Sequence, residues 1–92
     1  MTDRQHTASA DFWRAFRILS PEMRHRADKQ FALLKANPQH PSLQFKKIGG
    51  RHGHEIWSAR VTLNYRALAI RRPNGFLWFW IGDHKNYDSL IG

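Results

Sequence analysis

Apolar residues recur every three or four positions in the first forty residues, which is the spacing of a helix with one buried face. Phe12, Phe16 and Leu19, with Ala8 and Ala15 on the same side, predict a helix from Ala8 to Leu19. Ser20 and Pro21 mark the next boundary, because serine caps a helix and proline suits its first turn. A second helix is predicted from Pro21 to about Ala36, with an apolar stripe formed by Met23, Ala27, Phe31 and Leu34. The short linker predicts that the two helices form an antiparallel hairpin.

The second half of the chain alternates apolar and polar positions, which is the period of a strand. Four strands are predicted, at Leu43–Ile48, Ile56–Val61, Tyr65–Arg71 and Phe76–Ile81. The last is apolar on both faces, which favours an interior place in the sheet. Residues 1–7 are expected to be a flexible leader, and residues 83–91 a short helical or irregular tail. The sequence therefore predicts one α+β domain over residues 1–92, with an N-terminal helical hairpin packed on a mainly antiparallel four-stranded sheet.

Charge is unevenly distributed along the 92 residues, whose formal net charge is +8. Residues 43–72 carry seven lysines and arginines against a single acid, Glu55. Such a concentration favours a polyanion or an acidic protein partner, although solubility alone would also account for it. There is no cysteine, which is compatible with a reducing cytoplasm. No apolar run approaches the roughly 18 residues that span a membrane, so we expect a cytoplasmic protein with no membrane contact.

Several cationic and aromatic side chains are the candidate chemistry of this chain. Arg60 and Arg66 lie on consecutive predicted strands joined by a short turn, so a hairpin would bring them together. His84 directly follows the last strand, and Lys85 and Tyr87 come just after it. Cations, a group that titrates near neutrality and a phenol suffice to cleave RNA by internal transfer without a metal. We therefore expect no cofactor and no metal ion.

Each of these residues also has a structural interpretation. Arg60 would pair with Glu55, Asp83 or the C-terminus, His84 would cap a turn, Tyr87 would pack, and Lys46 and Lys47 would be a solvated strand edge. His52 and His54 stand in a glycine-rich loop without further ligands at suitable spacing, so a metal site is not favoured. Trp57, Trp78 and Trp80 are expected in the core, and Trp13 is expected to pack within the helical hairpin.

Four segments carry a resemblance to a known family: residues 41–47, Trp57-Ser58-Ala59-Arg60-Val61-Thr62, Tyr65-Arg66, and Gly82-Asp83-His84 with Tyr87. Together with the order of elements, they resemble the RelE/ParE superfamily of toxins from type II toxin–antitoxin modules, over nearly the whole chain. The Trp-Ser-x-Arg stretch followed by Tyr-Arg is most similar to the ribosome-dependent mRNA endonucleases of the RelE and YoeB type.

The resemblance implies a toxin that binds the ribosome and cuts mRNA, and that a cognate antitoxin neutralises. It matches Arg66 to the transition-state arginine and Arg60 to a phosphate-binding arginine. It places His84 and Tyr87 among the acid–base and base-stacking groups, and Lys46 and Lys47 on a strand that contacts ribosomal RNA. Lys85 is the further phosphate-binding candidate. The antitoxin is expected to contribute an acidic, partly disordered segment that folds on the basic surface.

The chain also departs from these relatives. Ile56 and Ser58 stand where the RelE type carries paired lysines, and Pro41-Ser42 stands where the YoeB type carries its glutamate base. Three interpretations therefore remain open. The chain is an mRNA interferase, a ParE-like inhibitor of DNA gyrase that performs no chemistry, or a basic RNA-binding relative without toxicity.

Overall fold

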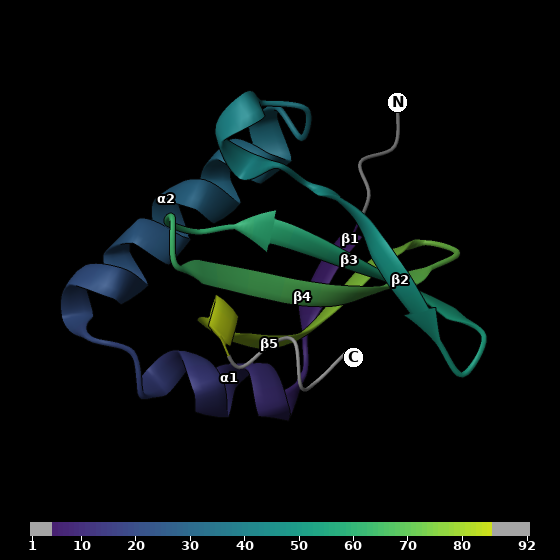
Figure 1. Ribbon diagram of the computed structural model, residues 1–92, viewed down its shortest axis with the longest axis horizontal. Helices are drawn as coiled ribbons and strands as arrows, with labels where there is room; N and C mark the ends of the chain where they lie inside the picture. The colour runs from purple at the N-terminus through teal and green to yellow at the C-terminus, as the bar shows by residue number, and fades with distance from the viewer. Residues whose placement is uncertain (1–4, 86–92) are drawn as a thin grey trace.

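The chain forms two helices and a five-stranded mixed sheet, seen in a computed structural model that describes residues 5–85 (Figure 1). The elements in chain order are β1 (Gln5–Ala8), α1 (Ala10–Arg17), α2 (Pro21–Ala36), a 3₁₀ turn η1 (Pro41–Leu43), β2 (Lys46–Arg51), β3 (His54–Arg60), β4 (Tyr65–Arg72) and β5 (Gly75–Asp83). The predicted α+β class is confirmed. None of the described helices is long and apolar enough to cross a membrane.

The sheet has the strand order β1-β5-β4-β3-β2. Strands β2 to β5 are antiparallel to their neighbours, whereas β1 runs parallel to β5. The prediction of four strands was wrong, because a fifth strand, β1, occupies residues 5–7 of the expected flexible leader together with Ala8, the expected first residue of the helix. This segment has only four residues and no clear alternation, so its sequence carries no strand signal. Pairing with β1 makes β5 an interior strand, which agrees with its apolar character on both faces.

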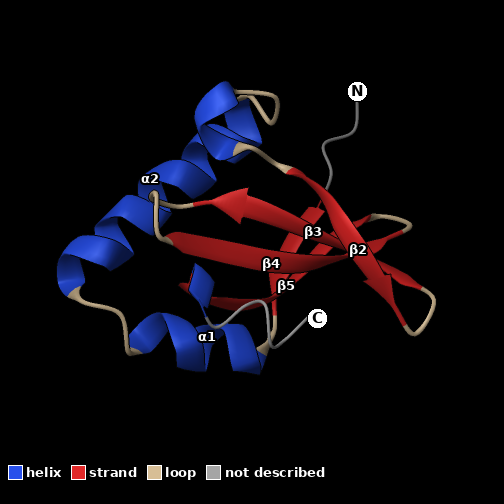
Figure 2. Cartoon of the chain, viewed as in Figure 1, coloured by secondary structure: helices blue, strands red, loops and turns tan. Residues whose placement is uncertain are grey.

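The predicted antiparallel helical hairpin was also wrong. Helix α1 lies along β5, whereas α2 diverges from the loop that joins the two helices (Figure 2). Each helix packs its apolar face on the sheet instead of on the other helix: α1 through Phe12 and Phe16, and α2 through Ala27 and Leu34. The guanidinium of Arg24 on α2 donates to the carbonyl of Leu19 at 2.7 Å and thereby holds the junction.

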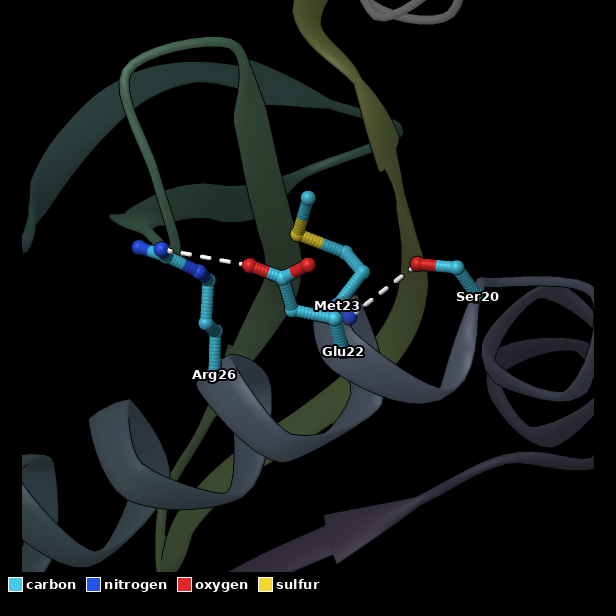
Figure 3. A network of polar contacts seen from close by, with 4 residues as sticks. All are labelled: Ser20, Glu22, Met23 and Arg26. Carbon is cyan, nitrogen blue, oxygen red and sulfur yellow. Dashed lines mark hydrogen bonds and ion pairs between the residues drawn. The ribbon is translucent and has the colours of Figure 1, made fainter.

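The start of α2 is fixed by a serine cap, as the sequence predicts. The Ser20 hydroxyl accepts a hydrogen bond from the backbone N–H of Met23 at 3.2 Å, and Pro21 occupies the first turn (Figure 3). Glu22 and Arg26 form an exposed ion pair one turn later, at 3.4 Å. Such a pair contributes little, so the cap is the stronger determinant of where this helix begins.

The helix-facing side of the sheet holds the main core, which includes Ala59, Ala67, Phe76, Trp78 and Ile81. The opposite side holds a second, smaller set of buried residues: Ile56, Ser58 and Leu68. Trp78 is therefore a core residue as predicted, and Trp57 and Trp80 are half-buried. The prediction for Trp13 was wrong, because the helices diverge and leave 45% of this side chain exposed.

Strand β2 begins at Lys46, three residues later than the predicted strand, which began at Leu43. Leu43 closes the 3₁₀ turn and is fully buried, and Gln44 then adopts a left-handed backbone with φ of 43°. At the far end, His52 and Gly53 have φ values of 53° and 81°. Two consecutive positive φ angles match the twist of the flanking strands and close the hairpin tightly.

Candidate functional site

Strand register places Arg60 and Arg66 directly opposite each other, at the ends of β3 and β4 that meet the 62–64 turn. The adjacent pair, Ala59 and Ala67, points into the core beneath the helices. Because side chains alternate along a strand, the two arginines leave the other face, which neither α1 nor α2 covers. We call this the helix-free face. The sequence prediction that a hairpin brings these two residues together is confirmed by the register.

The guanidinium of Arg66 is anchored on the turn between the two strands. Its Nη1 donates to the carbonyl of Thr62 at 3.0 Å and to that of Leu63 at 3.1 Å. The Thr62 carbonyl also accepts from the backbone N–H of Tyr65 at 3.3 Å, so the guanidinium adds a second donor to a turn that is already closed by the backbone. Arg66 therefore has a structural role and a fixed orientation before any ligand arrives.

Both the side chain and the backbone carbonyl of Arg60 form hydrogen bonds with residues outside its strand. Its Nη2 donates to the Gln44 side-chain oxygen at 2.9 Å, and its backbone carbonyl accepts from Gln30 of α2 at 3.0 Å. Its Nε is buried and has no hydrogen-bond partner within residues 5–85. A buried donor of this kind costs free energy, so the guanidinium would gain from an additional acceptor nearby. Within residues 5–85 Arg60 forms no ion pair with Glu55 or Asp83, and the C-terminus, the third partner that the sequence suggested, lies outside the described residues.

His84 lies at the same end of the sheet as the two arginines. Its backbone N–H donates to the carbonyl of Asn64, in the turn between β3 and β4, at 2.7 Å. The side chain is half-buried, and Lys85 next to it is exposed. The backbone N–H of Lys85 donates to the Asp83 carboxylate at 2.8 Å, which fixes the chain direction after β5. Tyr87, the remaining catalytic candidate, lies outside the described residues.

Lys46 and Lys47 are adjacent on β2 and therefore point to opposite faces. Lys46 stands opposite Ser58, on the helix-free face with the arginines. Lys47 stands opposite Trp57, and its ammonium group lies 3.9 Å from the Glu55 carboxylate. The structure thus brings one lysine of the predicted pair toward the candidate site and separates the other from it.

Two residues at this site have no signal in the sequence. Gln44 orients Arg60, but its role depends on its left-handed backbone and on a contact sixteen residues away. Gly82 stands opposite Arg66, and the Trp80 ring lies across it: a Cβ on Gly82 would come within 2.6 Å of Trp80 Cζ2. An indole ring therefore lies immediately beside Arg66.

The divergent helices leave an apolar groove of about 190 Å³ on the opposite side of the sheet. Its walls include Phe12, Trp13 and Phe16 of α1 and Ala27, Phe31 and Leu34 of α2, with Trp78 and Ile81 in its floor. Phe31 is 38% exposed, and the Lys35 ammonium lies 4.9 Å from its ring centroid. Of the charged groups in the lining, Arg60 is basic and Asp28 is acidic. This groove is large enough for a bulky apolar side chain of another molecule.

The assembled site offers two oriented guanidinium groups, with the His84 backbone held at the same end of the sheet. Guanidinium groups bind and stabilise phosphate oxygens. Within residues 5–85, no three histidine, aspartate or glutamate side chains gather as a metal site would require. The arrangement suits binding of a phosphate group.

Comparisons with known proteins agree with this architecture. The model of the ParE-like toxin domain family matches residues 21–89. The archaeal RelE–RelB complex from Pyrococcus horikoshii OT3 contains a chain with a TM-score of 0.68 and 16% identity, covering 94% of this chain and 99% of that one. YafQ from E. coli strain BL21(DE3) has a TM-score of 0.67 and 15% sequence identity, and the match covers 97% of this chain and 99% of that one.

A third solved structure, the toxin–antitoxin complex RelBE2 from Mycobacterium tuberculosis, gives a TM-score of 0.64 and 19% identity, covering 89% of this chain and 99% of that one. At such identities the likeness shows a shared fold. No curated protein matches the chain at the level of sequence.

Proposed function

The chain belongs to the ParE-like toxin domain family, within the RelE/ParE superfamily, and from this premise we propose that it is the toxin of a type II toxin–antitoxin module. We further propose that it acts as a ribosome-dependent mRNA endonuclease. The observation that carries this proposal is the convergence of Arg60, Arg66 and the His84 backbone on the single turn at residues 62–64.

The proposed reaction is an internal transfer on RNA. A base, His84 or Tyr87, takes the proton from a 2′-hydroxyl, whose oxygen attacks the adjacent phosphorus. Arg66 and Arg60 stabilise the additional negative charge of the pentacoordinate phosphorane, and an acid protonates the departing 5′ oxygen. Acid–base catalysis contributes about 10²–10⁴-fold, and preorganised cations add a comparable factor. Arg66 suits this role because the turn carbonyls already fix its direction, so little orientation entropy is lost on binding.

A cognate antitoxin is the proposed protein partner. The similar chains from Pyrococcus horikoshii and from E. coli were solved as RelE–RelB and DinJ–YafQ complexes. For this chain, a partner with acidic side chains complements the net charge of +8. An apolar side chain of the same partner would fill the groove between α1 and α2, and an acidic side chain beside it would meet the Lys35 ammonium, which lies over the Phe31 ring. A side chain in the groove would bury the exposed parts of Trp13 and Phe31, and burial of apolar surface favours binding.

Inhibition of DNA gyrase is the second candidate function, and the observation that favours it is the match to a ParE-like family model. In that case the basic surface would bind the enzyme or its DNA, and His84 would be dispensable. Ile56 and Ser58, which replace the paired lysines of the RelE type, leave fewer cations beside Arg60 than that type has. A non-toxic RNA-binding relative would show neither activity.

The discriminating experiment maps mRNA 5′ ends in a cell-free translation reaction with the parent protein and His84→Ala. We expect new ends within codons at the ribosomal A site, and their loss in the variant. Lys29→Ala on the exposed side of α2 is the matched control and should cut like the parent. Unchanged mRNA together with blocked supercoiling by gyrase would replace the endonuclease proposal with gyrase inhibition. Unchanged mRNA and normal supercoiling would leave a non-toxic relative.

A further inference from the structure

The direction of the Arg60 guanidinium depends on a single side-chain amide. Arg60 Nη2 donates to the Gln44 Oε1 at 2.9 Å, and within residues 5–85 the structure shows no other acceptor for this guanidinium. The Nε of Arg60 is buried and has no partner in the same range. The bond to Gln44 therefore decides where the remaining N–H groups of Arg60 point.

The two arginines of the site are fixed in different ways. Arg66 donates to the backbone carbonyls of Thr62 and Leu63, which no substitution of their side chains removes. Arg60 stands directly opposite Arg66 but takes its orientation from a side chain, that of Gln44. A substitution at position 44 therefore acts on one guanidinium and leaves the other anchored.

Gln44 holds its place with a backbone conformation that glutamine rarely adopts. It follows the 3₁₀ turn Pro41–Leu43 with φ of 43° and ψ of 44°, in the left-handed region. Glycine, and less often asparagine, ends a helical turn in this way, because the Cβ of other residues crowds the carbonyl oxygen. Among the described non-glycine residues, only Gln44 and His52 have a positive φ. The chain therefore carries a strained residue where asparagine would fit the backbone better.

The neighbours of Gln44 keep this strained backbone in place. Leu43 is fully buried, and the Phe45 ring lies 5.1 Å from the ring of Trp57. Because both neighbours are fixed in the core, the backbone at position 44 cannot relax without unpacking them. The Gln44 side chain is itself exposed, so burial does not account for a glutamine here. Its contribution is an oxygen at the end of a side chain long enough to reach Arg60.

The acceptor on Gln44 is neutral, which matters for an arginine that binds phosphate. A carboxylate at the same place would form an ion pair with the Arg60 guanidinium and would compete with phosphate oxygens. An amide oxygen accepts the same hydrogen bond without adding charge, so the positive charge of Arg60 remains available. Gln44 thus orients the guanidinium without neutralising it, which is how a preorganised cation stabilises a developing negative charge.

We propose that Gln44 is a positioning residue for phosphate binding by Arg60, and that the chain retains a strained backbone at position 44 for this role. The inference rests on the proposed function for the assignment of Arg60 as a phosphate-binding group. Asparagine tolerates the left-handed backbone, but its side chain is one methylene shorter, so its oxygen would stop short of Arg60. At position 44 we therefore expect stability and phosphate binding to change independently of each other.

The test measures both properties in the parent, Gln44→Asn and Gln44→Glu. The matched control is Gln39→Asn, the same chemical change at an exposed position in the preceding loop. Inorganic pyrophosphate is the probe, and its binding is followed at the Arg60 Nε–H signal in ¹⁵N–¹H spectra, assigned by its loss in Arg60→Lys. We expect Gln44→Asn to keep or raise the urea midpoint and to bind pyrophosphate about tenfold more weakly, because a hydrogen bond to a charged group is lost. Gln44→Glu should also keep the urea midpoint and bind pyrophosphate more weakly.

A purely structural role for Gln44 predicts a different pattern. The urea midpoint of Gln44→Asn would then fall, and all variants would bind pyrophosphate as tightly as the parent. Equal pyrophosphate affinities would overturn the proposal, as would a parent that shows no shift of the Arg60 signal.

Cleavage of mRNA by the same proteins separates this inference from the proposed function. Misplacement of Arg60 should lower kcat of Gln44→Asn by about tenfold or more, with a smaller change in KM. If the parent cuts mRNA and Gln44→Asn cuts it at the same rate, Gln44 has no positioning role and the proposed function stands. If the parent does not cut mRNA but loses pyrophosphate affinity in Gln44→Asn, the endonuclease proposal fails and the role of Gln44 stands.

Discussion

Gly82→Ala tests directly whether the Trp80 ring lies across β5 beside Arg66. Gly82 is in a strand, and positive φ is found at other glycines, Gly53 and Gly75. An alanine at position 82 would therefore clash with the Trp80 ring, but it would not strain the backbone. The added Cβ would lie 2.6 Å from Trp80 Cζ2 and 3.1 Å and 3.2 Å from two further ring atoms. Contacts this short force the indole to move.

The expected cost follows from two opposing effects. Overpacking of this kind costs about 1–3 kcal/mol. Replacing glycine also stiffens the unfolded chain, which contributes about 0.4–1 kcal/mol in favour of the folded state. We therefore expect a net loss of about 1–2 kcal/mol, which lowers the Tm of a domain of this size by roughly 4–16 °C.

The assay is urea and thermal denaturation of Gly82→Ala beside Gly49→Ala. Gly49 is also a strand glycine, but a Cβ there would meet nothing within 4 Å, so its substitution should be neutral or slightly stabilising. In a Trp80→Ala background, Gly82→Ala should lose its cost, because residues in contact couple by about 0.5–3 kcal/mol. If Gly82→Ala is as well tolerated as Gly49→Ala, or costs the same without Trp80, the ring does not lie where we place it.

Three further predictions concern the fold and the partner. Ser20→Ala should cost about 1 kcal/mol through loss of the cap on α2, and an unchanged urea midpoint would show that the cap does not stabilise this helix. Leu68→Ala should cost about 3–5 kcal/mol in urea denaturation because Leu68 is fully buried on the helix-free side, and a loss below about 1 kcal/mol would mean that this side is loosely packed. Trp13→Ser with Phe31→Ser should weaken binding of the cognate antitoxin at least about 30-fold by calorimetry, whereas Ile18→Ser, 85% exposed and outside the groove, should not; equal affinities would remove the groove from the interface.

The sheet's hairpins could be predicted from the sequence because they depend on local patterns. The period of two in the second half identifies β3, β4 and β5 to within a few residues. The short connection at 62–64 then sets Arg60 opposite Arg66 without further information. This is why the pairing of Arg60 with Arg66, at the centre of the candidate site, could be predicted from the sequence.

The features that were not predictable depend on contacts between distant segments. Strand β1 is too short to show a period and exists because it pairs with β5, about seventy residues away. The divergence of α1 from α2 depends on how both pack on the sheet, so the groove and the exposure of Trp13 had no local signal. Gln44 became part of the site only through its left-handed backbone and its bond to Arg60.

The proposed cleavage requires that residues beside the 62–64 turn promote attack by a ribose 2′-hydroxyl. A single 2′-deoxy substitution in the mRNA codon at the ribosomal A site removes this nucleophile, and cleavage of that message is measured beside the all-ribose message. We expect that the all-ribose message is cut, that its upstream fragment ends in a 2′,3′-cyclic phosphate, and that the deoxy position is not cut. Equal cleavage of both messages would show that the 2′-hydroxyl is not the nucleophile.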